Sequence, residues 1–559
     1  MIGVIANPED YPVVAEFFEL FKTPWEICNF ERRYDVLLCS RECEIPAIAK
    51  LAVIYSGRRK NTPGLDGTVA YTGTRTVSHR GRHIPIYGPS LFFRKDSSST
   101  KSPEDCDGGI AHATEWGDSS RVYIGYDLFD EVRLLLTKGQ PEEQASIPSL
   151  ERHIALLRDV IIDAGIPLVE ILPVPDGYNF IACLTHDVDH PSIGKHRFDH
   201  TMFGFLYRAV FGSVSRVFRG RLGVGGLLRN WLAALRLPLV YLGLSKDFWC
   251  DLERYVELEK GVGSSFFVIP FKDRPGRGSG GLAPKRRAAR YGAVEIACKL
   301  RQLMSRGCEV GLHGIDAWWN LDNCCVEIEE IRRVTGASHV GVRMHWLYFD
   351  DRSPEILERA GVDYDSSNGY NQTVGYRAGT TQVYKPLQTR YLLELPLHIM
   401  DTALFYPSHL DLSFTQAADR VAGILNNTSE VGGCVTVNWH DRSIAPERLW
   451  GAFYADLVHE LENRGAWFGT AAQAVSWFRK RRSAVFEDVR WESGAVRAKI
   501  AVGIGDDLPG LQLRVYSGKP PHSTISIHPA RPANVDSSDL GHSIDMYGPP
   551  LICSGQKET

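Results

Sequence analysis

The sequence FIACLTHDVDH, residues 180–190, is an apolar run that ends in a cluster of acidic and imidazole side chains. Its first five residues have the pattern of a short buried strand. Because side chains alternate along an extended backbone, Asp187 and Asp189 point the same way. Two carboxylates at one site suit a metal ligand and a general base, since the charge of a metal lets both stay ionised. The alternative is a loop whose acids cap a helix or face solvent.

Three further strand candidates also end in polar side chains. They are EVGLHGIDAWW at 309–319, GVRMHW at 341–346 and VTVNWHDR at 435–442. A single histidine after a strand is more often structural, so the argument depends on the four clusters occurring together. Strands that repeatedly end in Asp, His or Arg supply what a metal-dependent hydrolase needs: ligands, a base, an acid and a cation that keeps the base ionised.

From about residue 178 onward, short apolar runs alternate with helical patterns. The strand candidates are 180–184, 265–269, 308–312, 340–343 and 434–439, and helices are expected between them, for example at 294–304 and 354–360. This alternation predicts an α/β fold, either a βα barrel or an open parallel sheet. In such folds the active residues lie at the carboxyl ends of the strands, which is where the four clusters stand.

The flanking regions have other patterns. Residues 1–150 combine short apolar runs with an amphipathic stretch at 11–21, and we expect an N-terminal α/β module of unknown role. After residue 488 apolar residues recur every second position, which predicts a small β-rich C-terminal extension over 489–559. Its last thirty residues are rich in Pro, Ser and Gly, and we expect this end to be partly disordered.

Composition excludes several classes of protein. The 63 basic and 67 acidic residues give a net charge of −4, so we expect no nucleic-acid partner. The 12 cysteines contain no CxxC pair and the N-terminus has no basic leader, which predicts a reduced, cytoplasmic protein. The most apolar stretch, 231–244, is interrupted by Arg236 and Pro238 and is shorter than the ~20 residues that span a bilayer. No pattern indicates an oligomeric state.

The motifs THDVD, EVGLH, VRMHW, YDSS and NWHD, in this order, resemble those of the polysaccharide deacetylases, the carbohydrate esterase family 4 or NodB-homology group. The likeness covers roughly residues 178 to 480 and is greatest to the branch with HDVD in its first motif. It implies a distorted (β/α) barrel of the polysaccharide deacetylase type, and we expect the catalytic domain over 178–488.

The resemblance implies four catalytic roles. Asp187 matches the general base that takes a proton from water, and Arg343 matches the arginine that pairs with this base. A nearby cation keeps such a carboxylate deprotonated. His440 matches the general acid that protonates the leaving amine. Asp365, in YDSS, matches the carboxylate that orients this histidine.

The resemblance also implies a divalent metal ion, with zinc expected and cobalt or manganese as alternatives. Asp189 and His313 match two ligands, whereas the family's next ligand, a histidine four residues after the first, is Ala317 here. Three residues are candidates for the missing ligand: His345, Asp316 and His190. We favour His345, because it stands two residues after Arg343 and so shares its direction at a strand end.

Aromatic residues near the motifs are candidates for binding a carbohydrate substrate. We expect Trp318, Trp346 and Tyr376 to stack on sugar faces, although most such residues pack in cores. Arg377 is expected to contact an anionic sugar or phosphate, and a structural salt bridge is the alternative.

Residues 195–246 form a basic insertion. They hold nine Lys or Arg and a single acid, Asp199, among aromatic and aliphatic residues. A basic amphipathic helical segment of this kind predicts peripheral association with an anionic membrane or acceptance of a lipid-linked glycan. The alternative is a helical subdomain packed on the barrel with a solvated basic face.

These features predict a metal-dependent N-deacetylase that removes acetyl from an acetamido sugar of a bacterial surface polysaccharide or of its lipid-linked precursor. The enzyme would work in the cytoplasm, or peripherally on the inner face of the membrane. Two alternatives stay open. One is hydrolysis of another non-peptide C–N bond in a small molecule, and the other is a catalytically inactive glycan-binding scaffold, which Ala317 suggests.

Overall fold

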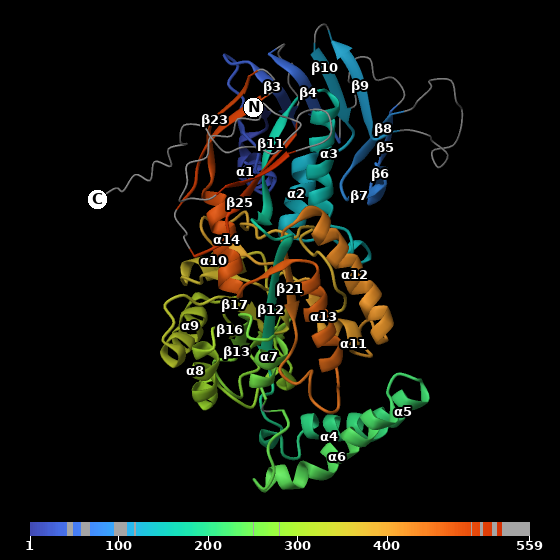
Figure 1. The fold of residues 1–559 in the computed structure, drawn as a ribbon, viewed down its shortest axis with the longest axis vertical. Helices are drawn as coiled ribbons and strands as arrows, with labels where there is room; N and C mark the ends of the chain where they lie inside the picture. The colour runs from blue at the N-terminus through green and yellow to red at the C-terminus, as the bar shows by residue number, and fades with distance from the viewer. Residues whose placement is uncertain are drawn as a thin grey trace. The chain divides into compact units, whose positions relative to one another are not determined.

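The computed structural model describes residues 1–41, 48–57, 68–93, 109–116, 119–249, 251–278, 280–492, 495–503, 507–516 and 523–527. The chain divides into two compact units (Figure 1). The first comprises residues 1–177, 378–380 and 477–559, and the second comprises residues 178–377 and 381–476. The predicted start of the catalytic domain at residue 178 coincides with the start of the second unit.

The first unit contains a six-stranded sheet in the order β2-β1-β3-β4-β10-β9, parallel except for its edge strand β9. Its strands are β1 (Ile2–Ile5), β2 (Trp25–Ile27), β3 (Tyr34–Cys39), β4 (Ala49–Tyr55), β9 (Ala111–Trp116) and β10 (Ser119–Ile124). Its helices are α1 (Tyr11–Phe21), α2 (Leu128–Thr137) and α3 (Ser149–Asp163). Two hairpin-like pairs, β5 (Thr68–Tyr71) with β8 (Ser90–Phe93) and β6 (Arg75–His79) with β7 (Arg82–Ile86), complete the α/β arrangement.

The C-terminal strands belong to this first unit. Strand β25 (Leu511–Tyr516) pairs antiparallel with β11 (Leu168–Pro175) on one side and with β26 (Ser523–Ile527) on the other. Strands β23 (Val485–Glu492) and β24 (Ala495–Ala501) pair as a hairpin. The extension predicted over 489–559 is therefore β-rich in its described part, but it is not separate from the N-terminal unit. Residues 528–559, where we expect disorder, lie outside the described residues.

The second unit is built on a parallel sheet of nine strands in its described part, ordered β19-β18-β17-β16-β13-β12-β21-β20, with β22 beside β12. Its strands are β12 (Phe180–Val188), β13 (Ser265–Val268), β16 (Glu309–Gly314), β17 (Val342–Met344), β18 (Tyr364–Asp365), β19 (Leu393–Glu394), β20 (Ile399–Met400), β21 (Cys434–Asn438) and β22 (Ala466–Phe468). The sheet curls into part of a barrel, and the predicted α/β fold of barrel type is confirmed.

Helices alternate with these strands along the chain. They are α7 (Glu253–Leu258), α8 (Ala297–Ser305), α9 (Leu321–Thr335), α10 (Ser353–Arg359), α11 (Asp401–Phe405), α12 (Phe414–Val431), α13 (Gly451–Asn463) and α14 (Ala471–Ser483), the last crossing the boundary between units. A short pair, β14 (Arg277–Gly278) and β15 (Gly281–Leu282), lies between β13 and α8. Every residue of β12 is buried, which explains its unbroken apolar run: this central strand has neighbours on both edges and side chains on both faces.

The basic insertion of the second unit is helical. It contains α4 (His200–Tyr207), the π-helix η5 (Arg208–Gly212), α5 (Ser213–Phe218) and α6 (Val224–Tyr241). Figure 1 shows these helices projecting from the part of the unit that holds the sheet. A small core that includes Met202, Phe205, Ala233 and Leu237 holds them together. Among the described residues, no helix is long and apolar enough to cross a membrane.

Candidate active site

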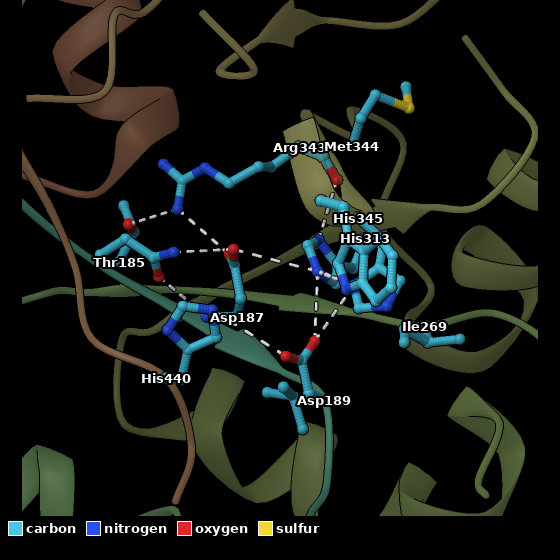
Figure 2. Close-up of polar contacts among 12 residues, drawn as sticks. Thr185, Asp187, Asp189, Ile269, His313, Arg343, Met344, His345 and His440 are labelled. Atoms are coloured by element: carbon cyan, nitrogen blue, oxygen red, sulfur yellow. Dashed lines mark hydrogen bonds and ion pairs between the residues drawn. The ribbon is translucent and has the colours of Figure 1, made fainter. Parts of the chain in front are cut away.

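Strands β12, β16, β17 and β21 bring the four predicted polar clusters to one edge of the sheet, with β13 between β16 and β12. Strands β12, β13, β16 and β17 pair in parallel register, and β21 pairs with the other side of β12. Their carboxyl ends therefore meet, as the alternating pattern predicts. Figure 2 shows Asp187, Asp189, His313 and His345 directed toward one another, with Arg343 and His440 on either side.

Three ligand atoms converge at this edge: Asp189 directly follows β12, His313 lies in β16, and His345 directly follows β17. Asp189 Oδ1 lies 3.4 Å from His313 Nε2 and 3.3 Å from His345 Nδ1, and the two ring nitrogens are 3.0 Å apart. The other nitrogen of each ring faces a backbone carbonyl. His313 Nδ1 lies 2.9 Å from the carbonyl oxygen of Arg343, and His345 Nε2 lies 3.1 Å from the carbonyl oxygen of Arg287. A carbonyl can only accept, so those nitrogens carry the protons. The nitrogens that face each other therefore present lone pairs.

These three atoms fit a divalent cation. Burial lowers the pKa of His345, which favours the neutral, ligating imidazole. The buried Oδ1 of Asp189 has no hydrogen-bond partner. Facing lone pairs beside an unpartnered carboxylate oxygen would repel one another unless a cation lay between them, and two imidazoles with one carboxylate are ligands that zinc prefers.

The other two candidates for the third ligand lie elsewhere. Asp316 Oδ1 accepts hydrogen bonds from the backbone N–H of Arg277 at 2.7 Å and from Trp319 Nε1 at 2.8 Å. His190 Nδ1 lies 3.2 Å from His196 Nε2. Only His345 of the three candidates joins Asp189 and His313 in a group whose ligand atoms all lie within 4.8 Å of one another.

Asp187 is held beside this group by a cation and an amide. Its Oδ1 accepts a hydrogen bond from Arg343 Nη1 at 3.1 Å, and its Oδ2 accepts one from Asn438 Nδ2 at 2.8 Å. Arg343 is fully buried and also donates to Thr185 Oγ1 and Ser366 Oγ, at 2.6 and 2.8 Å. The guanidinium therefore fixes the direction of the carboxylate and places a positive charge beside it. The pairing of Arg343 with Asp187, which the resemblance implies, is present in the structure.

His440 is oriented by Asp401, the first residue of α11. His440 Nδ1 lies 2.6 Å from Asp401 Oδ1, and the backbone N–H of His440 donates to Asp401 Oδ2 at 2.7 Å. Burial alone would lower the pKa of His440, but the contact with Asp401 raises it to about 10. The imidazole is thus a proton donor, and its Nε2 lies 3.9 Å from Asp189 Oδ2.

Asp365 does not orient His440, so that prediction is wrong. Its Oδ1 accepts hydrogen bonds from the backbone N–H and the hydroxyl of Ser367, at 3.0 and 2.5 Å. Burial raises its pKa to about 6, and Asp365 in turn helps to raise the pKa of Glu394 beside it. Asp365 and Glu394 therefore share a proton as a buried structural pair.

A cavity of about 610 Å³ opens onto the site. Its lining includes Asp187, Asp189, His313, His345 and His440. Trp346 also lines it and has a left-handed backbone with φ of 64°. Such a conformation costs about 1–3 kcal/mol in a residue other than glycine, and such residues often cluster at functional sites.

Of the other predicted substrate residues, none lines this cavity in the described part of the chain. Trp318 and Tyr376 are core residues, 5% and 0% exposed, and the Tyr376 hydroxyl donates to the Ile424 carbonyl at 2.8 Å. The Arg377 guanidinium donates to the Gly369 carbonyl at 2.9 Å and lies over the ring of Phe349. Trp346 keeps its predicted place. The predictions that Trp318 and Tyr376 stack on a sugar are wrong, because both rings are in the core, and Arg377 is not among the residues that line the cavity.

Sequence reasoning missed two residues that hold the catalytic groups. Asp401 follows β20, a strand of only two residues, so no periodic pattern marks it. Asn438 ends β21 inside the motif NWHD, and its position two residues before His440 was the available signal. Side chains two apart at a strand end share a direction, and here both reach the site.

Comparison with known proteins gives structural likeness alone. No family model matches the sequence, and no curated protein matches it. Several similar solved structures are family 4 carbohydrate esterases or polysaccharide deacetylases.

A Mycobacterium smegmatis protein provisionally named a polysaccharide deacetylase shares 20% identity, with a TM-score of 0.34, over 56% of this chain and 95% of its own. A family 4 acetyl xylan esterase from Clostridium thermocellum, in complex with a cobalt ion, shares 14% identity, with a TM-score of 0.24, over 53% of this chain and 91% of its own. Bacillus subtilis PdaA, a family 4 carbohydrate esterase, shares 10% identity, with a TM-score of 0.28, over 58% of this chain and 89% of its own. Function is therefore argued below from the side chains of the site.

Proposed function

We propose that the chain is a metal-dependent N-deacetylase acting on an acetamido sugar of a bacterial surface polysaccharide or its lipid-linked precursor, on the cytoplasmic side of the membrane. One observation carries the proposal: three unprotonated ligand atoms share a cavity with a cation-paired carboxylate and a carboxylate-oriented imidazolium. This set provides the ligands, base and acid that hydrolysis of an amide requires.

Asp189, His313 and His345 would hold the metal ion, for which we propose zinc. A bound divalent ion supplies Lewis acidity that polarises the acetamide carbonyl. Asp187 takes the proton of the attacking water, because hydrogen bonds from Arg343 and Asn438 fix the direction of its carboxylate. The water oxygen bonds to the carbonyl carbon in this step.

His440 completes the reaction. Its Nε2–H gives a proton to the amide nitrogen as the C–N bond breaks, so acetate and a free amino sugar leave. Asp401 holds the ring by Nδ1 and stabilises the imidazolium until that proton is transferred. Trp346, at the wall of the cavity, is placed to stack on a sugar ring.

Metal content and acetate release test the proposal together. We expect about one divalent ion per wild-type chain, since three protein ligands form one site, and loss of that ion in His313→Ala and in His345→Ala. Asp187→Asn should keep the metal and lose acetate release from acetamido sugars by roughly 100-fold or more.

Two outcomes would contradict the proposal. Absence of bound metal after incubation with zinc, cobalt or manganese would remove the hydrolase mechanism. Bound metal without acetate release from any acetamido sugar would leave a glycan-binding scaffold or hydrolysis of a different C–N bond.

A further inference from the structure

One end of the cavity is strongly cationic. Arg208 of η5, Arg442 and Arg448 line the cavity that also contains the metal ligands. Arg448 donates a hydrogen bond to the hydroxyl of Tyr406, which lines the same cavity. Burial alone would raise the pKa of Tyr406, but Arg448, Arg442, His440 and Arg208 hold it below its usual value. These cations therefore act on one region of the wall.

The three arginines have no carboxylate partner. Among the described residues, no Asp or Glu oxygen lies within 4.0 Å of their guanidinium nitrogens. The nearby Glu447 instead accepts a hydrogen bond from Trp249 Nε1 at 3.3 Å. The Nε atoms of Arg208 and Arg448 are buried and have no hydrogen-bond partner. Such a cluster favours an anion, because Arg442 and Arg448 lie close enough to Arg208 to lower its pKa and no carboxylate forms an ion pair with any of the three in the described part of the chain.

The insertion is built so that Arg208 reaches this region. Arg208 begins η5, and π-helical turns inside α-helices frequently occur at functional sites. Gly204, one turn earlier, leaves room for the side chain: a Cβ there would lie 3.1 Å from Arg208 Nη1. Burial, together with the positive charges of Arg442 and Arg448, lowers the pKa of Arg208 to about 10.

We propose that Arg208, Arg442 and Arg448 bind a phosphoryl group of the substrate. This inference rests on the proposed function and specifies its substrate as a phosphorylated or diphosphate-linked acetamido sugar. A carboxylate carries one charge and two coplanar oxygens, whereas a phosphate ester carries up to two charges and directs oxygens several ways. Three converging guanidinium groups match the phosphate better.

Titration calorimetry with inorganic phosphate on the full chain at low salt tests the anion site. We expect Arg208→Gln to weaken phosphate binding at least tenfold, while Arg301→Gln, at an exposed arginine of α8, leaves it unchanged. We also expect His313→Ala, which removes a metal ligand, to bind phosphate normally. Three results would overturn the inference. Arg208→Gln could bind phosphate as tightly as wild type does, wild type could bind acetate as tightly as phosphate, or His313→Ala could be the one variant that loses phosphate binding.

Kinetics separate this inference from the proposed function. If the chain releases acetate, Arg208→Gln should raise KM for N-acetylglucosamine 1-phosphate at least tenfold and leave KM for N-acetylglucosamine unchanged. If neither compound yields acetate, the deacetylase proposal loses support while the calorimetry still decides the anion site. A lipid-linked diphosphate sugar in vesicles, run beside the soluble ester, shows which source of the phosphoryl group is used.

The same insertion exposes an unusually large apolar surface. Of the 24 exposed large apolar side chains in the described residues, 13 lie between residues 198 and 244. They are Phe198, Phe203, Tyr207, Phe211, Phe218, Val224, Leu228, Trp231, Leu232, Leu235, Leu239, Leu242 and Leu244. Figure 1 shows the helices that carry most of them standing apart from the sheet. A surface of this kind marks an interaction site, since soluble chains seldom leave so many large apolar residues exposed together.

The charges around this surface favour an anionic partner. Arg197, Arg219, Arg229, Arg236 and Lys246 are exposed, and the segment 195–246 contains only one acid. A second copy packed face to face would bring like charges together, which is costly. An anionic lipid surface accepts both the apolar side chains and the arginines.

We infer that residues 197–246 dock on an anionic bilayer, with α6 lying in the plane of its interface. This inference is independent of the phosphoryl site, because it depends on exposed side chains and not on the cavity. It places a diphosphate-linked substrate and the enzyme on the same membrane.

Vesicle flotation tests the docking. We expect wild type to float with phosphatidylcholine vesicles that contain phosphatidylglycerol and much less with phosphatidylcholine alone. Replacing Leu232, Leu235 and Leu239 together by Asn should reduce flotation at least tenfold. The matched control replaces Leu282, Val294 and Val326, which are exposed elsewhere in the same unit, by Asn and should float as wild type does.

Two results would overturn the docking. The first is equal flotation of the insertion variant and wild type. The second is a wild-type dimer in sedimentation that does not bind vesicles and becomes a monomer in the insertion variant, because the apolar surface would then be an interface between two copies.

Discussion

The pairing of His440 with Asp401 predicts that Asp401, and not Asp365, is needed for the role of His440 in acetate release. In Asp401→Asn an amide replaces the acceptor of the Nδ1 proton, so the ring loses both its orientation and the charge that stabilises its imidazolium. We expect kcat for acetate release to fall roughly 100- to 10 000-fold. Metal content should stay unchanged, because Asp401 contacts none of Asp189, His313 and His345.

Asp365→Asn is the matched control. Asp365 and Glu394 share a proton, so the pair carries one negative charge. In Asp365→Asn the amide is neutral and Glu394 can carry that charge. We expect kcat within a few-fold of wild type. A large loss of kcat in Asp365→Asn, with normal kcat in Asp401→Asn, would contradict the geometry. It would mean that Asp365 orients His440, as the resemblance implies.

At the residue scale, the sequence predicted those groups that alternate along strands. Asp187 in β12 and Asp189 just after it share a direction, and His345 stands two residues after Arg343 at another strand end, so periodicity predicted that each pair points to one place, while the resemblance implied the roles. Aromatic residues obey no such rule. Trp346 belongs to the motif VRMHW, whereas Trp318 and Tyr376 only follow motifs in the sequence and are buried, because bulky rings near strand ends also fill the core.

At the scale of elements, the parallel sheet of the second unit was predictable because its central strands are continuous apolar runs. Strand β12 is buried along its whole length and β21 likewise, which is the pattern of strands covered on both faces. Strands β18, β19 and β20 have two residues each and leave no periodic signal. Asp365 and Asp401 both stand at such short strands, so no periodic pattern in the sequence pointed to Asp401 as the residue that orients His440.

At the scale of the whole chain, the sequence could not show which strands pair. Strand β25 pairs with β11, about 340 residues earlier in the chain. Its alternating pattern is also typical of an independent hairpin, but the strand is part of the N-terminal unit. Alternation indicates that a strand has one buried face and does not indicate its partner.

Buried carboxylates make the stability of the folded chain depend on pH, and Glu327 of α9 gives the clearest case. It is 4% exposed and accepts hydrogen bonds from the backbone N–H groups of Ile315 and Asp316, at 2.9 and 2.8 Å. Burial raises its pKa from 4.5 to about 7. A carboxyl whose folded pKa is raised contributes stability that is complete below pH 4.5 and is lost as pH rises through about 7.

Glu327→Gln removes this dependence, because the amide is neutral at every pH. We expect the free energy of unfolding of wild type, relative to Glu327→Gln, to fall by about 3 kcal/mol between roughly pH 4.5 and 7.5, from the size of the pKa shift. Urea denaturation at a series of pH values measures the difference. Glu329→Gln, at an exposed position of the same helix, should follow wild type throughout. A difference between wild type and Glu327→Gln that stays constant over this range would mean that Glu327 is ionised in the folded chain and that its two backbone hydrogen bonds outweigh its burial.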